Sequence, residues 1–83
     1  MKAHHSKNYQ SHKIRDEIWT FVDGTGDLLI DGHIRNVRRG DVAYIHKGQK
    51  HSLRAVTDLH FIEVQIGVEL AIEDAENCEW VWN

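Results

Sequence analysis

The sequence predicts an all-β domain, a sandwich or barrel of antiparallel strands, over residues 1–83. Short runs rich in β-branched and aromatic residues recur along the chain, and most of them end at a turn that contains glycine or aspartate. Such runs fit a pleated, half-buried surface, and short strands at regular spacing are typical of sandwiches and barrels. The chain has no proline, no repeat and no linker-like tract, so we expect a single domain.

The strands are expected in order between turns that contain glycine or aspartate. They cover residues 18–22, 27–30, 33–37, 42–45, 51–56 and 59–67. The glycine-rich turn at 23–26 is of hairpin type, and the strands 51–56 and 59–67 are expected to pair around Thr57 and Asp58. In the last strand Phe61, Glu63 and Gln65 occupy one face, and Ile62, Val64 and Ile66 occupy the other.

The chain changes character after Gly67. A segment that contains Ala71, Glu73, Ala75 and Glu76 predicts one or two helical turns. Trp80 and Trp82 carry large apolar surfaces, so we expect them to pack either on their own barrel or across a dimer interface. A domain this small buries only about 60% of the surface that its unfolded chain exposes. A bound metal and a homodimer are therefore both expected.

Composition excludes several classes of partner. The net charge is −3 and the pI is about 6.1, so neither nucleic acid nor an anionic membrane surface is expected to bind. The single cysteine, Cys78, cannot form an internal disulfide. The first ten residues lack the apolar core of a signal peptide, and no run approaches the roughly 18 apolar residues of a membrane span. These features predict a cytoplasmic protein without a membrane partner.

Four side chains are candidate metal ligands: Gln10, His12, Glu17 and His51. Residues two apart on a strand point the same way, so Gln10 and His12 can face one interior. Glu17 can return from the next strand after a turn, and His51 opens a distant strand. A mixed nitrogen and oxygen set suits one divalent transition metal, zinc first, with manganese, iron, cobalt or nickel as alternatives.

The joint spacing of these residues resembles the two motifs of the cupin superfamily. The first motif is matched by Gln10-Ser11-His12, four residues, Glu17, six residues and Gly24. The second is matched by Gly40, five residues, His46-Lys47-Gly48, two residues, His51, three residues and Ala55. The resemblance implies a small cupin barrel, a jelly roll or double-stranded β-helix, with its core over about residues 10–67 and a tail over 68–83.

A narrower resemblance is to the cupin domain of type II mannose-6-phosphate isomerases, which are often fused to mannose-1-phosphate guanylyltransferases. The residues that carry it run from Gln10 to Trp19 and from Phe61 to Gly67. Ile14 stands where that family has a second histidine, His46 replaces the usual turn proline and Ala55 replaces the usual asparagine. None of these three positions supplies a ligand in the cupin motif. The resemblance implies a sugar phosphate as small-molecule partner and interconversion of mannose 6-phosphate and fructose 6-phosphate through a cis-enediol.

Such an isomerisation needs a base that moves a proton between C1 and C2. His46 and His60 are the candidate catalytic bases, and Glu63 and Lys50 are further possibilities. Arg15 matches the family's arginine, where it would bind phosphate or enediolate oxygens; the alternative is a surface ion pair with Asp16. Whether the chain is an enzyme stays open. The alternatives are a non-catalytic metal-binding cupin that binds a sugar or sugar nucleotide as a sensor or accessory domain, and a metal-free structural barrel.

Overall fold

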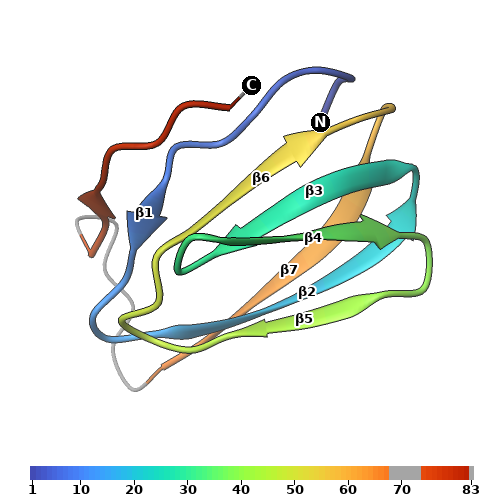
Figure 1. The fold of residues 1–83 in the computed structure, drawn as a ribbon. Coiled ribbons are helices and arrows are strands. Elements are labelled where there is room, and N and C mark those ends of the chain that lie inside the picture. Colours follow the sequence, from blue (N-terminus) through green and yellow to red (C-terminus); the bar gives the residue numbers. More distant parts are fainter. Residues whose placement is uncertain (68–73, 83) are drawn as a thin grey trace.

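The computed structural model describes residues 1–67 and 74–82 and contains two antiparallel sheets that face each other (Figure 1). The larger sheet has the strand order β4-β3-β6-β1-β8 and the smaller has the order β5-β2-β7. The strands are β1 Gln10–Ser11, β2 Asp16–Asp23, β3 Thr25–Ile30, β4 His33–Arg38, β5 Val42–Ile45, β6 His51–Ala55, β7 His60–Ile66 and β8 Glu76–Asn77. The all-β class is confirmed. The described part of the chain contains no helix long and apolar enough to cross a membrane.

The strands lie close to the positions predicted from the sequence, and β3 and β4 form a hairpin at the predicted turn Asp31-Gly32. β3 pairs with β4 so that Ile30 lies opposite His33, which leaves a two-residue turn. Both turn residues, Asp31 and Gly32, have positive φ angles of 46° and 80°. Two consecutive positive φ angles match the right-handed twist of the flanking strands. This turn therefore fixes the register of the β3–β4 hairpin.

Two other expected pairings are wrong, because the chain crosses between the sheets at those turns. β2 pairs with β5 and β7, whereas β3 pairs with β4 and β6, so the turn at Gly24 joins different sheets. The turn at Thr57 and Asp58 likewise takes the chain from β6 in one sheet to β7 in the other. In both sheets every second residue of a strand faces the shared interior, so a strand that crosses to the other sheet shows the same period-two pattern as a strand that returns in a hairpin.

The core lies between the two sheets and takes side chains from both. Trp19 and Phe21 of β2 are 1% exposed and face the interior, and Phe61 packs against their rings with centroids 5.3 and 5.7 Å away. The buried cluster consists of Trp19, Phe21, Leu28, Val37, Ala43, Ile45, Leu53, Ala55 and Leu59. The same inward alternation of β2 places Glu17, two residues before Trp19, at the end of this core.

The residues before β1 form an extended segment along β6. Backbone hydrogen bonds join His4 N to Ala55 O at 2.8 Å, Ala55 N to His5 O at 2.9 Å and Lys7 N to Leu53 O at 2.9 Å. This N-terminal segment provides hydrogen-bond partners for the backbone groups along one edge of β6, as a further strand would. It also carries Lys7 to the same end of the barrel as Glu17.

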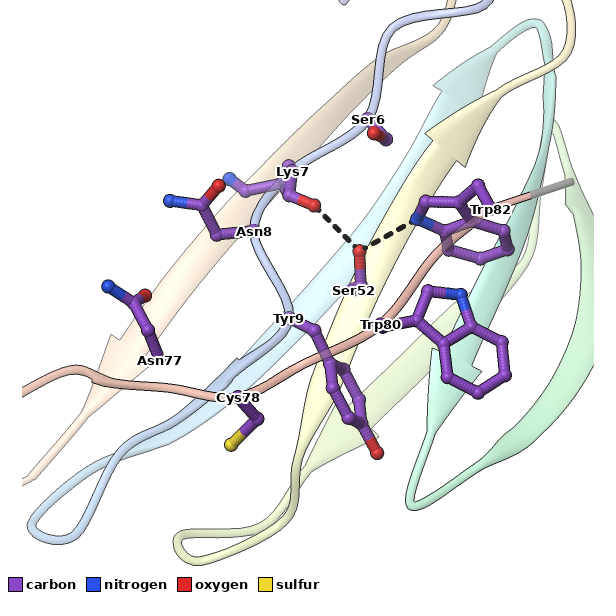
Figure 2. A pocket seen from close by; sticks show the side chains of 9 residues that line it. All are labelled: Ser6, Lys7, Asn8, Tyr9, Ser52, Asn77, Cys78, Trp80 and Trp82. Carbon is purple, nitrogen blue, oxygen red and sulfur yellow. Dashed lines mark hydrogen bonds between the residues drawn. The ribbon is translucent and has the colours of Figure 1, made fainter.

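The tail does not form the expected helix where it is described. Ala71 and Glu73 lie outside the described residues, and Glu76 and Asn77 form β8, which pairs with β1. The open edge of β1 offers backbone partners that override the weak helical preference of this short run. Trp82 Nε1 donates a hydrogen bond to Ser52 Oγ at 3.2 Å, and Trp80 lies 5.9 Å from Trp82, between centroids (Figure 2). Trp82 thus packs on β6 of its own chain, whereas Trp80 contacts Trp82 and Tyr9 and stays 38% exposed.

Candidate metal centre

Three predicted ligands come together at one end of the barrel. His12 follows β1, Glu17 lies on β2 and His51 opens β6, and each of the three is at most 5% exposed. One ligand atom from each residue lies within 4.8 Å of the others. The pairing of Gln10 with His51 joins two of these segments in the larger sheet, and Glu17 points toward them from the smaller sheet. The site therefore depends on both sheets.

The ring of His51 is oriented for ligation through one nitrogen. Its Nδ1 lies 2.9 Å from the carbonyl oxygen of Gln49, which can only accept a hydrogen bond, so Nδ1 carries the proton. The lone pair is then on Nε2, which lies 3.8 Å from Glu17 Oε1. Metal-binding histidines commonly donate their other N–H to a backbone carbonyl in this way, which fixes the tautomer and the ring orientation.

Glu17 is a buried carboxylate with a donor on each oxygen. Oε1 accepts a hydrogen bond from Trp19 Nε1 at 3.0 Å, and Oε2 accepts one from Arg15 Nε at 2.9 Å. Its side chain is 2% exposed, and that of Arg15 is 12% exposed. The guanidinium thus balances the negative charge in a place from which water is largely excluded.

Arg15 also contacts His12. Its Nη2 lies 2.8 Å from His12 Nε2, and since a guanidinium only donates, this ring nitrogen accepts the hydrogen bond. Burial is the main cause that lowers the pKa of His12 below its ordinary value, and the neighbouring Arg15 acts in the same direction. The neutral imidazole that results is the form that binds a metal.

The same contacts make Arg15 a competitor of a metal ion. Replacing Arg15 by methionine removes a positive charge a few ångströms from the ligand atoms, so we expect the variant to bind Zn²⁺ or Co²⁺ roughly tenfold more tightly. Isothermal titration of the chelator-stripped protein measures this. Arg38→Met, at an exposed position on β4, is the matched control and should bind like the wild type. Weaker binding by Arg15→Met would contradict the prediction.

A cavity of about 130 Å³ opens onto this cluster. Gln10, the fourth predicted ligand, lines the same cavity, so all four side chains are brought to one place. Arg15 lines it as well, rather than pairing with Asp16 on the surface. Imidazole, carboxylate and amide donors without a thiolate fit a divalent transition metal.

His46 and His60, the two candidate bases, do not reach this cavity. His46 follows β5 and is exposed, with its ring 4.6 Å from that of Tyr44, between centroids. His60 pairs with Asp23 at the far end of β2, because β7 runs antiparallel to β2 and brings Gln65 opposite Glu17. Lys50 does not line the cavity either; its backbone N–H donates to Asp31 Oδ1 at 2.9 Å.

The cavity holds instead a lysine and a carboxylate at its mouth. Lys7 Nζ lies 3.7 Å from Glu63 Oε1, and the ammonium stands 5.4 Å from the ring centroid of Trp19 and 5.5 Å from that of Phe61. Glu63 was one of the further candidates for the base. Lys7 was missed, since it belongs to a polar run without periodicity and only its pairing along β6 places it here.

Comparison with known proteins agrees with this architecture. The family model "Mannose-6-phosphate isomerase C-terminal" matches residues 1–79, whereas no curated protein matches the sequence. A protein from Thermotoga maritima described as a predicted oxalate decarboxylase has a TM-score of 0.78 and 27% identity, over 82% of this chain and 61% of that one. A cupin 2 conserved barrel domain protein from Salinispora arenicola has a TM-score of 0.74 and 27% identity, over 82% of this chain and 58% of that one.

A third solved structure shows the fold alone. Oxalate decarboxylase from Bacillus subtilis superposes with a TM-score of 0.82 at 22% identity, over 93% of this chain and 22% of that one. The chain thus spans less than two thirds of the length of each of these three proteins. The expected cupin barrel is confirmed by these likenesses, and the narrower resemblance is confirmed by the family model. The chain belongs to the Mannose-6-phosphate isomerase C-terminal family, whose model covers almost all of it.

Proposed function

We propose that the chain binds one divalent transition metal, zinc first, through Gln10, His12, Glu17 and His51. The convergence of three buried ligand side chains within 4.8 Å supports the site. The proton on His51 Nδ1 leaves Nε2 free, and the carboxylate of Glu17 supplies the negative charge that a dication requires. Gln10 would contribute its amide oxygen from the same cavity.

On this centre we propose an aldose–ketose isomerisation of a sugar phosphate, with mannose 6-phosphate and fructose 6-phosphate as the pair. The observation that carries the proposal is that the ligand cluster shares its cavity with two cations and a second carboxylate, Arg15, Lys7 and Glu63. A bound divalent metal would polarise the oxygens on C1 and C2. At about 130 Å³ the cavity is below the roughly 300–1,000 Å³ of a complete ligand pocket, so only the reacting end of the sugar enters.

Glu63 would transfer the proton, and Lys7 and Arg15 would stabilise the negative charge of the intermediate. Glu63 takes the proton from C2 of the aldose and returns it to C1, while the hydroxyl proton on O2 moves to O1. Negative charge develops on these oxygens between the two transfers, and Lys7 and Arg15 offer N–H donors and positive charge to it. The contact of Lys7 with Glu63 and the two aromatic rings orients the ammonium toward the cavity.

The test is turnover of mannose 6-phosphate by the wild type and by Glu63→Gln, each with its metal content measured. We expect Glu63→Gln to keep its metal and to lose a factor of about 10²–10⁴ in kcat, the usual contribution of a general base. The exposed Glu79→Gln is the control and should retain full activity.

Three other results would each contradict one part of the proposal. A wild type that holds metal and yet shows no turnover would refute the isomerase and favour the non-catalytic metal-binding module. A wild type without metal would refute the metal centre itself. Activity of Glu63→Gln close to that of the wild type would remove Glu63 from the mechanism.

A further inference from the structure

The outer face of the smaller sheet is apolar and exposed. Eight side chains form it, and we call them the outer face: Ile18, Thr20, Val22, Val42, Tyr44, Ile62, Val64 and Ile66. Six of them, all except Ile18 and Thr20, are between 42% and 57% exposed. A sheet with one face on the core normally presents polar side chains on the other face.

Strand register makes these residues one continuous patch. Ile18 lies opposite Tyr44 on β5 and opposite Val64 on β7. Thr20 lies in the same way between Val42 and Ile62. Apolar rows therefore run across all three strands, whereas single exposed apolar residues would need no explanation.

Charged groups border this patch but do not enter it. None of the eight side chains carries a charge, and Asp16 and His60 stand near opposite ends, on β2 and β7. Depletion of charge at the centre with a polar rim is the composition of a protein interface. A foreign partner chosen by charge would need complementary groups inside the patch, and the outer face has none.

We propose that the outer face is the interface of a homodimer, in which the smaller sheets of two copies pack face to face. A two-fold axis brings identical apolar rows together, and two twisted sheets pack in this way about 10 Å apart. The strands β2, β5 and β7 have eight, four and seven residues. At about 3.3 Å per residue and about 4.8 Å between strands, they give a flat footprint of roughly 300 Å². The protruding side chains raise the accessible area toward the roughly 600 Å² per partner at the lower end of stable interfaces.

This location differs from the one that the sequence suggested for a dimer. Trp80 and Trp82 lie against the larger sheet of their own chain, on the side of the molecule away from β5, β2 and β7 (Figures 1 and 2). Both tryptophans thus have contacts within their own chain, and six of the eleven exposed large apolar side chains of the described residues belong to the outer face.

Sedimentation equilibrium of the full chain tests the interface. The wild type is expected to be a dimer at micromolar concentration. Val64 lies on β7 beside Ile18 of the central strand β2. Val64→Lys places one unpaired charge from each copy within the interface and should raise the dimer dissociation constant about a hundredfold or more. Tyr44→Lys, on the opposite edge strand, should act in the same direction, and it keeps the test valid if one variant misfolds.

Two lysine substitutions outside the outer face serve as controls. Ile34→Lys on β4 and Val81→Lys in the tail change side chains that are 53% and 81% exposed, and both variants should dimerise like the wild type. Near-ultraviolet circular dichroism verifies that each variant is folded. A monomeric wild type would overturn the proposal, and so would folded Val64→Lys and Tyr44→Lys proteins that remain dimeric. Loss of the dimer in Val81→Lys alone would move the interface to the tail.

Discussion

Replacing Glu17 by alanine is expected to abolish metal binding and to lower the free energy of unfolding of the metal-free protein by about 3–5 kcal/mol. The carboxylate is 2% exposed, and its two oxygens accept hydrogen bonds from Trp19 and Arg15. Its removal leaves a mostly buried guanidinium without its counter-charge and a buried indole N–H without an acceptor. Since a domain of this size has roughly 4–12 kcal/mol of stability, the variant should be close to unfolding.

Urea denaturation followed by tryptophan fluorescence measures the loss, and elemental analysis of the purified protein measures the metal. Glu17→Gln is the matched control, because it keeps the volume and an acceptor for the indole while it removes the charge. It should lose its metal with a smaller loss of stability. An exposed carboxylate, Glu79→Ala, should change stability by no more than about 0.5 kcal/mol. Retention of one equivalent of metal by Glu17→Ala would refute the role of Glu17 as a ligand.

The positions of the strands were predictable because burial of one face imposes alternation, and turn residues mark the ends. The partners of those strands were only partly predictable. Asp31 and Gly32 specify a two-residue hairpin through their positive φ angles. Nothing local at Gly24 or at Thr57 says whether the chain returns within its own sheet or crosses to the other. Only the packing of two layers around one core decides that.

The residues of the candidate site were also only partly predictable from the sequence. His12, Glu17 and His51 were found together because their spacing is that of a known motif, and the structure brings the three within reach of one ion. His46 and His60 were chosen by chemistry alone, which carries no information on position. Lys7 reaches the cavity through backbone pairing between the N-terminal segment and β6, and such non-local pairing leaves no pattern in the sequence.

The alternation of apolar residues in β7 was recognised in the sequence, but the face that is buried was not. Ile62, Val64 and Ile66 were correctly placed on one face, and that face is exposed, while Phe61 and Glu63 are half-buried on the inner side. A pattern of period two identifies which residues share a face, but it does not identify which face meets the core. A second copy of the chain on the outer face would account for the apolar residues there.

Gly24→Ala is expected to cost about 3–5 kcal/mol in the free energy of unfolding, the sum of a steric clash and a strained backbone. Gly24 has a φ angle of 88°, and a Cβ atom there would stand 2.0 Å from the backbone oxygen of Asp58. The backbone at Gly24 and the backbone at Asp58 cannot shift apart easily, because each belongs to a turn that joins strands of different sheets. Urea denaturation of the metal-free protein measures the loss.

Gly32→Ala separates the two contributions to this loss. Gly32 has a similar φ angle of 80°, but a Cβ atom there meets nothing within 4 Å, so its cost should be only about 1–2 kcal/mol of backbone strain. Equal losses in the two variants would show that the contact between Gly24 and Asp58 is not tight. A larger loss in Gly24→Ala would show that these two crossings hold the sheets in place. Since β2 carries Glu17 and β6 carries His51, the contact between the crossings also fixes the relative position of two proposed metal ligands.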